Sequence, residues 1–375
     1  MANNKLHSWI KNIRMEWGFD SLAAISRTTA FSSIVALGSM LSSCNDLMHD
    51  DLPPCDMGVD LQFKYDYNVQ RADMFNDHVG GVCVFVFDEQ GNLVARQDAA
   101  NEGKSRPLKD PNYAMRIDLQ PGKYRFATFA FQKKYEEALS QAGAKFHIEA
   151  PAAGESIEKL RARLDRNAGK VENQALPLDT LWQGLSNETV EVKDLQVTHH
   201  TISLIRDTKQ LTISLHQLDK PADIHAEDFS YQITDANGYI NYDNSLLPDE
   251  ELTYTPYKTW TTEFTTPEGT VQERTAHAAM MFSRLVLHPA TENEKNAILS
   301  IWNKKTGEEV VRINLADFLA QGRGAFEAMN YSAQEFLDRE YDYKLDFFLK
   351  GDKWQYVKLG ISILDWSKRI QRADL

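Results

Sequence analysis

The stretch Leu211-Thr212-Ile213-Ser214-Leu215-His216 decides the fold class, because its apolar and polar side chains alternate without a break. Alternation with a period of two places the three apolar side chains on one face of a β-strand and the three polar ones on the other. One face then packs on a core while the other meets solvent. This pattern is typical of a strand in a β-sandwich.

The polar residues Arg206-Asp207-Thr208-Lys209 stand immediately before this stretch and separate it from another strand-like segment. We place a domain boundary there. Short segments with strand patterns, bounded by turn residues, lie on both sides of it. On the N-terminal side we expect strands at Val59 to Tyr67, Val82 to Phe87, Leu93 to Gln97, Ala114 to Leu119, Lys123 to Phe131, Thr189 to Val192 and Thr201 to Ile205. On the C-terminal side we expect them at Phe229 to Thr234, Ser283 to Leu287, Ile298 to Trp302, Val310 to Leu315, Tyr343 to Leu349 and Gln355 to Leu364.

A few segments have helical spacing instead. We expect short helices near Tyr135 to Ala142, with Ile157, Leu160 and Leu164 on one face of a second, and at Ala316 to Gln321 and Ala333 to Arg339. The sequence therefore predicts an all-β protein with short helical inserts. It forms two tandem β-sandwich domains, at residues 58–206 and 207–375.

The tetrad Leu41-Ser42-Ser43-Cys44 has the form of a bacterial lipoprotein cleavage box. Ser42 and Ser43 are small residues beside the cut, Leu41 is the apolar residue behind them, and the Cys44 thiol accepts the lipid. The preceding apolar run is about 12 residues, whereas a membrane-spanning helix needs about 20. We therefore expect residues 1–43 to be a signal peptide and Cys44 to carry lipid, palmitate included. The alternative is a buried helix that ends in cysteine.

The segment after the cleavage box, residues 44–57, is acidic and contains Pro53-Pro54. This composition favours an extended tether between the lipid and the first domain. Cys55 and Cys83 form a candidate disulfide in an oxidising compartment. The alternative is that Cys83 is a small buried hydrophobe inside its apolar run. The sequence leaves both interpretations open.

Composition and missing motifs limit the function classes. The net charge of −13, with no basic stripe, argues against nucleic acid as a partner. The common zinc, serine-nucleophile and phosphate-binding motifs are absent, so no catalytic residue, metal site or cofactor is predicted. A hydrolase with paired carboxylates has no local signature and stays the least favoured hypothesis.

Two tryptophans, Trp182 and Trp260, lie in polar surroundings. Exposed rings of this kind can stack on sugars, so both are candidate glycan contacts. The alternative is packing in a core or at a sheet edge.

Several segments together resemble the FimB-type fimbrial-anchor lipoproteins of Bacteroidales. The resemblance rests on the block Asp51 to Val59, on Phe63 to Asn68, Ala72 to Phe75 and Val84 to Asp88, and on Leu119 to Tyr124, Leu204 to Thr208 and the closing Ile361 to Trp366. It implies transthyretin-like or immunoglobulin-like sandwiches. It also implies a lipid-anchored protein of the outer membrane that holds the base of a fimbrium at the cell surface, limits fimbrial length and supports adhesion.

The resemblance also implies partners, namely fimbrial shaft or accessory subunits that dock by β-strand addition. We expect the strand Val59 to Tyr67 to be retained, so that one end of the polymer stops here, with Arg71 as a candidate cleavage point. The acidic residues Asp46, Asp50 and Asp51 fit either a surface-display signal or a merely soluble tether. The alternative function is a surface lipoprotein that binds glycan.

Overall fold

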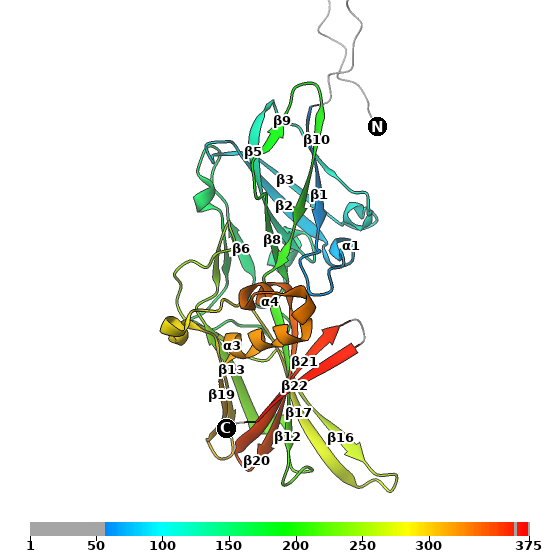
Figure 1. Cartoon of the computed structure of the whole chain (residues 1–375), viewed down its shortest axis with the longest axis vertical. Helices are drawn as coiled ribbons and strands as arrows, with labels where there is room; N and C mark the ends of the chain where they lie inside the picture. The colour runs from blue at the N-terminus through cyan, green and yellow to red at the C-terminus, as the bar shows by residue number, and fades with distance from the viewer. Residues whose placement is uncertain (1–56, 364–365, 374–375) are drawn as a thin grey trace, which may run out of the picture. The chain divides into compact units, whose positions relative to one another are not determined.

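The computed structural model describes residues 57–363 and 366–373, and their side chains except those of residues 327, 328 and all after 360. The described residues belong to one compact unit. This unit consists mostly of strands, with a few short helices (Figure 1). The all-β prediction with short helical inserts is confirmed.

Two sheets share the core nearest the start of the described chain. The smaller sheet has the strand order β10 (Val197–Ser203), β1 (Gly58–Lys64), β4 (Met115–Ile117), with β1 parallel to β10 and antiparallel to β4. The larger sheet has the order β11 (Ile205–Arg206), β8 (Leu181–Leu185), β5 (Gly122–Phe131), β2 (Gly81–Phe87), β3 (Leu93–Ala100), and β9 (Val190–Val192) pairs with the start of β5.

Strand β2 is buried on both faces, which explains its continuous apolar run. Val82, Val84 and Val86 face the core that the two sheets share. Cys83, Phe85 and Phe87 face a second, larger core.

A second pair of sheets encloses much of this larger core. The six-stranded sheet has the order β16 (Lys258–Thr265), β17 (Val271–Phe282), β12 (Lys209–Gln217), β20 (Asp342–Lys350), β21 (Lys353–Ile363), β22 (Trp366–Ala373). The four-stranded sheet has the order β15 (Leu252–Tyr254), β13 (Phe229–Asp235), β18 (Ile298–Asn303), β19 (Glu309–Asn314). In β12, Leu211, Ile213 and Leu215 are fully buried, as their alternation predicts.

A small three-stranded sheet joins segments from both sides of residue 206. Its order is β14 (Tyr239–Asn241), β7 (Arg161–Leu164), β6 (Phe146–Glu149). Because these strands pair across the expected boundary, and because the described residues form one compact unit, the division into two domains stays a prediction.

The helices are short. The α-helices are α1 (Phe75–His78), α2 (Tyr135–Ser140), α3 (Leu315–Ala320) and α4 (Ala333–Arg339), and the 3-10 helices are η1 (Pro107–Lys109), η2 (Ile157–Lys159), η3 (Ala226–Asp228), η4 (Ala290–Lys295) and η5 (Gln321–Met329). Asn314 and Ser332 cap α3 and α4, each accepting a hydrogen bond from a backbone N–H of the first turn. The predictions of these two helices are confirmed. No helix in the described part of the chain is both long enough and apolar enough to span a membrane.

The predicted helix containing Ile157, Leu160 and Leu164 is wrong. One turn of 3-10 helix, η2, is followed by the strand β7. The three side chains are buried all the same, at 6%, 0% and 1% exposure. Helical and strand conformations both bury this apolar set, and pairing of β7 with β6 and β14 selects the strand.

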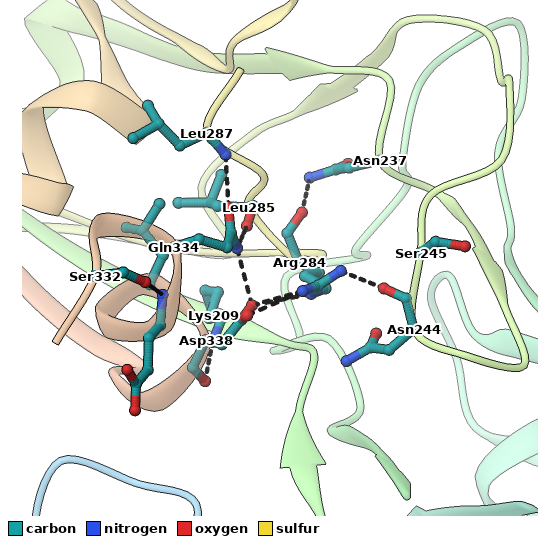
Figure 2. Close-up of polar contacts among 12 residues, drawn as sticks. Lys209, Asn237, Asn244, Ser245, Arg284, Leu285, Leu287, Ser332, Gln334 and Asp338 are labelled. Carbon is teal, nitrogen blue, oxygen red and sulfur yellow. Dashed lines mark hydrogen bonds and ion pairs between the residues drawn. The ribbon is translucent and has the colours of Figure 1, made fainter. Parts of the chain in front are cut away.

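The predicted strand from Ser283 to Leu287 is also wrong, because side chains take the place of a neighbouring strand. Asn237 donates its side-chain amide to the Ser283 and Arg284 carbonyls at 3.2 and 3.0 Å. Gln334 bonds the Leu285 carbonyl and the Leu287 amide, at 3.0 and 2.8 Å (Figure 2). These contacts satisfy the backbone without a sheet.

Candidate functional site

Strand β1 is the first described strand and lies in the middle of its sheet. Its side chains Val59, Leu61 and Phe63 are 0%, 0% and 5% exposed, and Tyr65 just after it is 0% exposed. The Phe63 ring stacks on Phe75 with centroids 5.6 Å apart. Each such apolar side chain stabilises the fold by about 1.5–3 kcal/mol. The strand is therefore an integral part of the core and not a loosely attached edge.

The loop that leaves β1 is held by two side chains. One Asp73 carboxylate oxygen accepts hydrogen bonds from the backbone amides of Tyr65 and Phe75, each at 3.0 Å. Asn68 is fully buried and donates its side-chain amide to the carbonyls of Tyr65 and Ala72, both at 2.8 Å. These bonds close the loop on itself.

Arg71, the candidate cleavage point, lies at the exposed apex of this loop. Its φ of 55° is in the left-handed region, and its amide donates to the Asn68 carbonyl at 3.2 Å. Its guanidinium lies 3.3 Å from the Met329 sulfur. Cleavage after Arg71 requires this loop to open first.

An aromatic clamp ties the same loop to helix α4. The Arg339 guanidinium lies between two tyrosine rings, 3.9 Å from the centroid of Tyr67 and 4.9 Å from that of Tyr331. Arg339 also donates to the Glu335 carboxylate at 2.9 Å. Cation–π contacts of this kind each contribute about 0.5–2 kcal/mol. The segment after β1 is thus attached to the C-terminal half of the chain.

A buried cation lies beside the end of β1. Arg206 is 6% exposed, and its guanidinium lies 4.1 Å from the Tyr341 ring centroid and 5.7 Å from that of Trp182. Its Nε donates to the Thr208 carbonyl at 3.1 Å. Tyr65 packs edge-on against Trp182, with centroids 5.9 Å apart. Burial is the main reason that the pKa of Arg206 is lowered.

The neighbouring polar groups form the ionic cluster in Figure 2. Arg284 donates two hydrogen bonds to the Asp338 carboxylate, both at 3.0 Å. It also bonds the Asn244 carbonyl. Lys209 is fully buried and donates to the carbonyls of Asp338 and Glu340 at 3.0 and 2.9 Å. The Asp338 carboxylate and the carbonyl acceptors together offset the free-energy cost of burying these two cations.

Burial dominates the titration of this cluster. It lowers the pKa of Lys209 and raises that of Asp207, both fully buried. Burial also raises the pKa of Glu340 to about 7. These contacts form a structural junction, because they join Lys209 and Arg284 to Asp338 of helix α4.

No local sequence pattern links Arg284 with Asp338, because 54 residues separate them and one lies in a coil and the other in a helix. The polar residues 206–209 stand out in the sequence, but the sequence does not reveal that all four are buried.

The predicted lipidation site Cys44 and its box Leu41, Ser42 and Ser43 lie outside the described residues, as does Cys55. The lipid anchor and the Cys55–Cys83 disulfide therefore stay predictions. Cys83 itself is 2% exposed in β2, and burial raises the pKa of its thiol to about 12.

The burial of Trp182 contradicts the prediction that this residue contacts a glycan. The side chain is 0% exposed, enclosed by Tyr65, Arg206 and the rest of the core, and offers no surface to a sugar. Trp260 is partly exposed in β16. One face of its ring stacks on His277 at 4.9 Å, and the Lys258 ammonium lies 5.2 Å from its centroid. The described residues contain no group of three His, Cys, Asp or Glu side chains that could hold a metal.

Comparison with known proteins identifies the family of this chain. The family model for fimbrillin-A associated anchor proteins Mfa1 and Mfa2 matches residues 52–372. The chain belongs to this family. The resemblance to fimbrial-anchor proteins is confirmed. The Mfa1 and Mfa2 family consists of fimbrial anchor proteins and is not a class of enzymes.

Similar proteins are found in Porphyromonas and Bacteroides. The minor fimbrium anchoring subunit Mfa2 of Porphyromonas gingivalis is 23% identical over 290 residues, which cover 76% of this chain and 78% of that protein. A candidate adhesin from Bacteroides thetaiotaomicron has a solved structure that matches with a TM-score of 0.70 and 29% identity, over 85% of this chain and 100% of that one.

Two further solved structures share the fold. One, described as candidate polysaccharide binding proteins from Bacteroides thetaiotaomicron, matches with a TM-score of 0.63 and 29% identity, over 84% of this chain and 98% of that one. The fimbrial anchor protein Mfa2 of Porphyromonas gingivalis matches with a TM-score of 0.57 and 17% identity, over 83% of this chain and 98% of that one.

Proposed function

We propose that this member of the anchor family is a lipid-anchored outer-membrane subunit that attaches the base of a fimbrium to the cell. Family membership supports the anchor role. The cleavage box ending in Cys44 supports the lipid, and three acyl chains exceed the two signals that stable membrane attachment requires. The acidic tether then places the first sheet close to the membrane surface.

The position of β1 is the observation that carries this proposal. A neighbouring subunit that adds a strand in the middle of a sheet has to displace a strand that is already there. Here the site is filled by β1, whose Val59, Leu61 and Phe63 are buried. The hydrogen bonds of Asn68 in the loop around Arg71, and the contact of Arg339 with Tyr67, help to hold β1 in this sheet.

A subunit that keeps its own first strand accepts no further subunit at that sheet, so the polymer ends at this protein. This property limits fimbrial length and leaves other sheet edges for the fimbrial shaft or accessory subunits. Adhesion follows from retention of the fimbrium on the cell. The protein would act as an attachment point and not as an enzyme.

The experiment compares Cys44→Ala with Met48→Ala, a change in the same tether outside the cleavage box. Protein and fimbriae are measured in membrane and medium fractions. We expect Cys44→Ala to release both into the medium and Met48→Ala to leave both on the cell. Fimbriae that remain attached to cells producing acylation-deficient protein would contradict the anchor role.

A second candidate function, binding of a surface glycan, has one observation in its favour. Trp260 lies on the outward face of the six-stranded sheet, and Phe348 and Tyr356 lie stacked on that face at 4.4 Å. Partly exposed rings of this kind can stack on sugars. Loss of glycan binding by Trp260→Ala, with fimbriae still attached, would support this candidate over the first.

A further inference from the structure

Strand β16 ends the six-stranded sheet and leaves an open edge. In the described part of the chain it pairs with β17 alone (Figure 1). An end strand presents unpaired N–H and C=O groups along its outer side, and proteins usually shield them with proline, charge or a covering segment. The sequence from Lys258 to Thr265 contains no proline, and its single carboxylate, Glu263, is paired with Arg274 of β17 at 2.7 Å. Its one lysine, Lys258, lies at the start of the strand, 5.2 Å from the Trp260 ring. The Thr261 hydroxyl accepts a hydrogen bond from the Ala226 amide of η3 at 2.9 Å.

The hairpin of β16 and β17 extends past the rest of the sheet (Figure 1). Pairing of β17 with β12 begins only at Thr275, so residues 271–274 pair with β16 alone. A two-stranded ribbon is marginally stable in water by itself. The Phe264 side chain on this ribbon is 63% exposed. The unpaired backbone groups of β16 could hydrogen-bond a strand of a partner, and the exposed Phe264 ring beside them could pack against its side chains.

One face of β16 is symmetric about its centre. Side chains of alternate residues share a face, so Trp260, Thr262 and Phe264 lie together, on the side where Trp260 stacks on His277. The other face carries Thr261 and Glu263. An aromatic, threonine, aromatic order reads the same in both directions.

We propose that the open edge of β16 pairs with the same edge of a second copy of this chain, antiparallel, with Thr262 on the two-fold axis. An isologous contact of this kind is the commonest way in which identical subunits associate. In this register Trp260 lies opposite Phe264 of the second copy, twice, and Thr262 lies opposite itself. Aromatic and threonine pairs are favourable cross-strand neighbours.

Charge supports this register. Glu263 lies opposite Thr261, and Lys258 lies opposite Thr266, beside the turn that contains Glu268 of the second copy. No like charges face each other. A register centred on residue 263 would place Glu263 against itself, and one centred on residue 261 would separate the aromatic pair. Charge and aromatic pairing therefore select the centre at Thr262.

The dimer is concentration-dependent, and its formation by the purified chain does not require the proposed lipid anchor. Pairing of one eight-residue strand with its copy buries less surface area than the about 1,200–2,000 Å² of a stable interface. Attachment of copies to one membrane would raise their local concentration and favour pairing.

The test introduces Thr262→Cys into the purified full chain. Directly opposite residues in antiparallel strands have Cα atoms about 4.5–5.5 Å apart, within the range that a disulfide spans. Glu263→Cys is the matched control, because residue 263 is also exposed and its two copies would lie diagonally at about 7–8 Å. After mild oxidation we expect about tenfold more covalent dimer from Thr262→Cys than from Glu263→Cys. The unsubstituted chain measures the crosslinking that the native cysteines cause.

A second variant tests the interface without a crosslink. Thr262→Glu changes an exposed position and places two carboxylates directly opposite each other on the two-fold axis, where like charges repel. We expect it to abolish the concentration-dependent dimer in sedimentation measurements while the circular dichroism spectrum is unchanged. Equal crosslinking of the two cysteine variants, or a dimer that survives Thr262→Glu, would overturn the proposal. Docking of another protein's strand on a chain that stays monomeric would overturn it as well.

Discussion

Replacement of Asp338 with alanine should be strongly destabilising, because it leaves a buried cation without its carboxylate. The Asp338 and Arg284 side chains are only 10% and 12% exposed, and two hydrogen bonds at 3.0 Å join them. The change also removes the acceptor of a Gln334 side-chain bond at 3.0 Å. Removing one partner of a buried ion pair costs about 3–5 kcal/mol. We expect a loss of this size in the free energy of unfolding.

Equilibrium unfolding in urea, followed by circular dichroism, measures this loss from the midpoint and slope of the transition. The matched control is Asp98→Ala, which breaks the Arg96–Asp98 pair. Its two side chains are 38% and 39% exposed. An exposed pair contributes about 0–1 kcal/mol, so this variant should unfold close to the unsubstituted protein.

A double variant separates the ion pair from the packing around it. Arg284→Met combined with Asp338→Leu removes both charges and keeps apolar volume, so it should recover part of the stability that Asp338→Ala loses. If Asp338→Ala costs no more than Asp98→Ala, the ionic cluster does not stabilise the junction and our account of it is wrong.

Three more changes test other parts of the structure. Leu61→Ala in β1 should lower the free energy of unfolding in urea by about 2–5 kcal/mol, because the side chain is fully buried. Gln62→Ala on the same strand should change it by less than about 0.5 kcal/mol. Equal losses would mean that β1 is not part of the core. Burial raises the pKa of Asp235 to about 7 from an ordinary 3.8, so this carboxyl contributes stability below about pH 4 that is lost as the pH rises through 7. Asp235→Asn should therefore flatten the fall in stability between about pH 4 and 7, and an unchanged pH profile would contradict the burial argument. Asn68→Ala should speed cleavage after Arg71 by an arginine-specific protease, followed by mass spectrometry, because it removes the bonds that close the loop; equal rates would show that those bonds do not protect it.

The strands that bury one or both of their faces could be predicted from the sequence. Leu211, Ile213 and Leu215 alternate because one face of β12 packs on the core, and β2 reads as a continuous apolar run because both faces do. Each pattern depends only on the residues of one strand, so sequence alone reveals it.

The hairpin of β16 and β17 could not be predicted in this way. Most of β16 is exposed on both faces, so its sequence shows no alternation that a core would impose. Polar surroundings were also misleading at Trp182, because its neighbours Thr180 and Gln183 are themselves buried. The contacts of Arg284 with Asp338 depend on residues far apart in the chain, and only the folded structure brings them together.

Proteolytic processing of the N-terminal region is the point on which the anchor account depends most. Mass spectrometry of the intact protein, extracted from native membranes, measures both the lipid and the first residue in one experiment. The account predicts a chain that begins with acylated Cys44 and continues unbroken through Arg71, with β1 in place. A chain that begins at Ala72, without lipid and without β1, would contradict it.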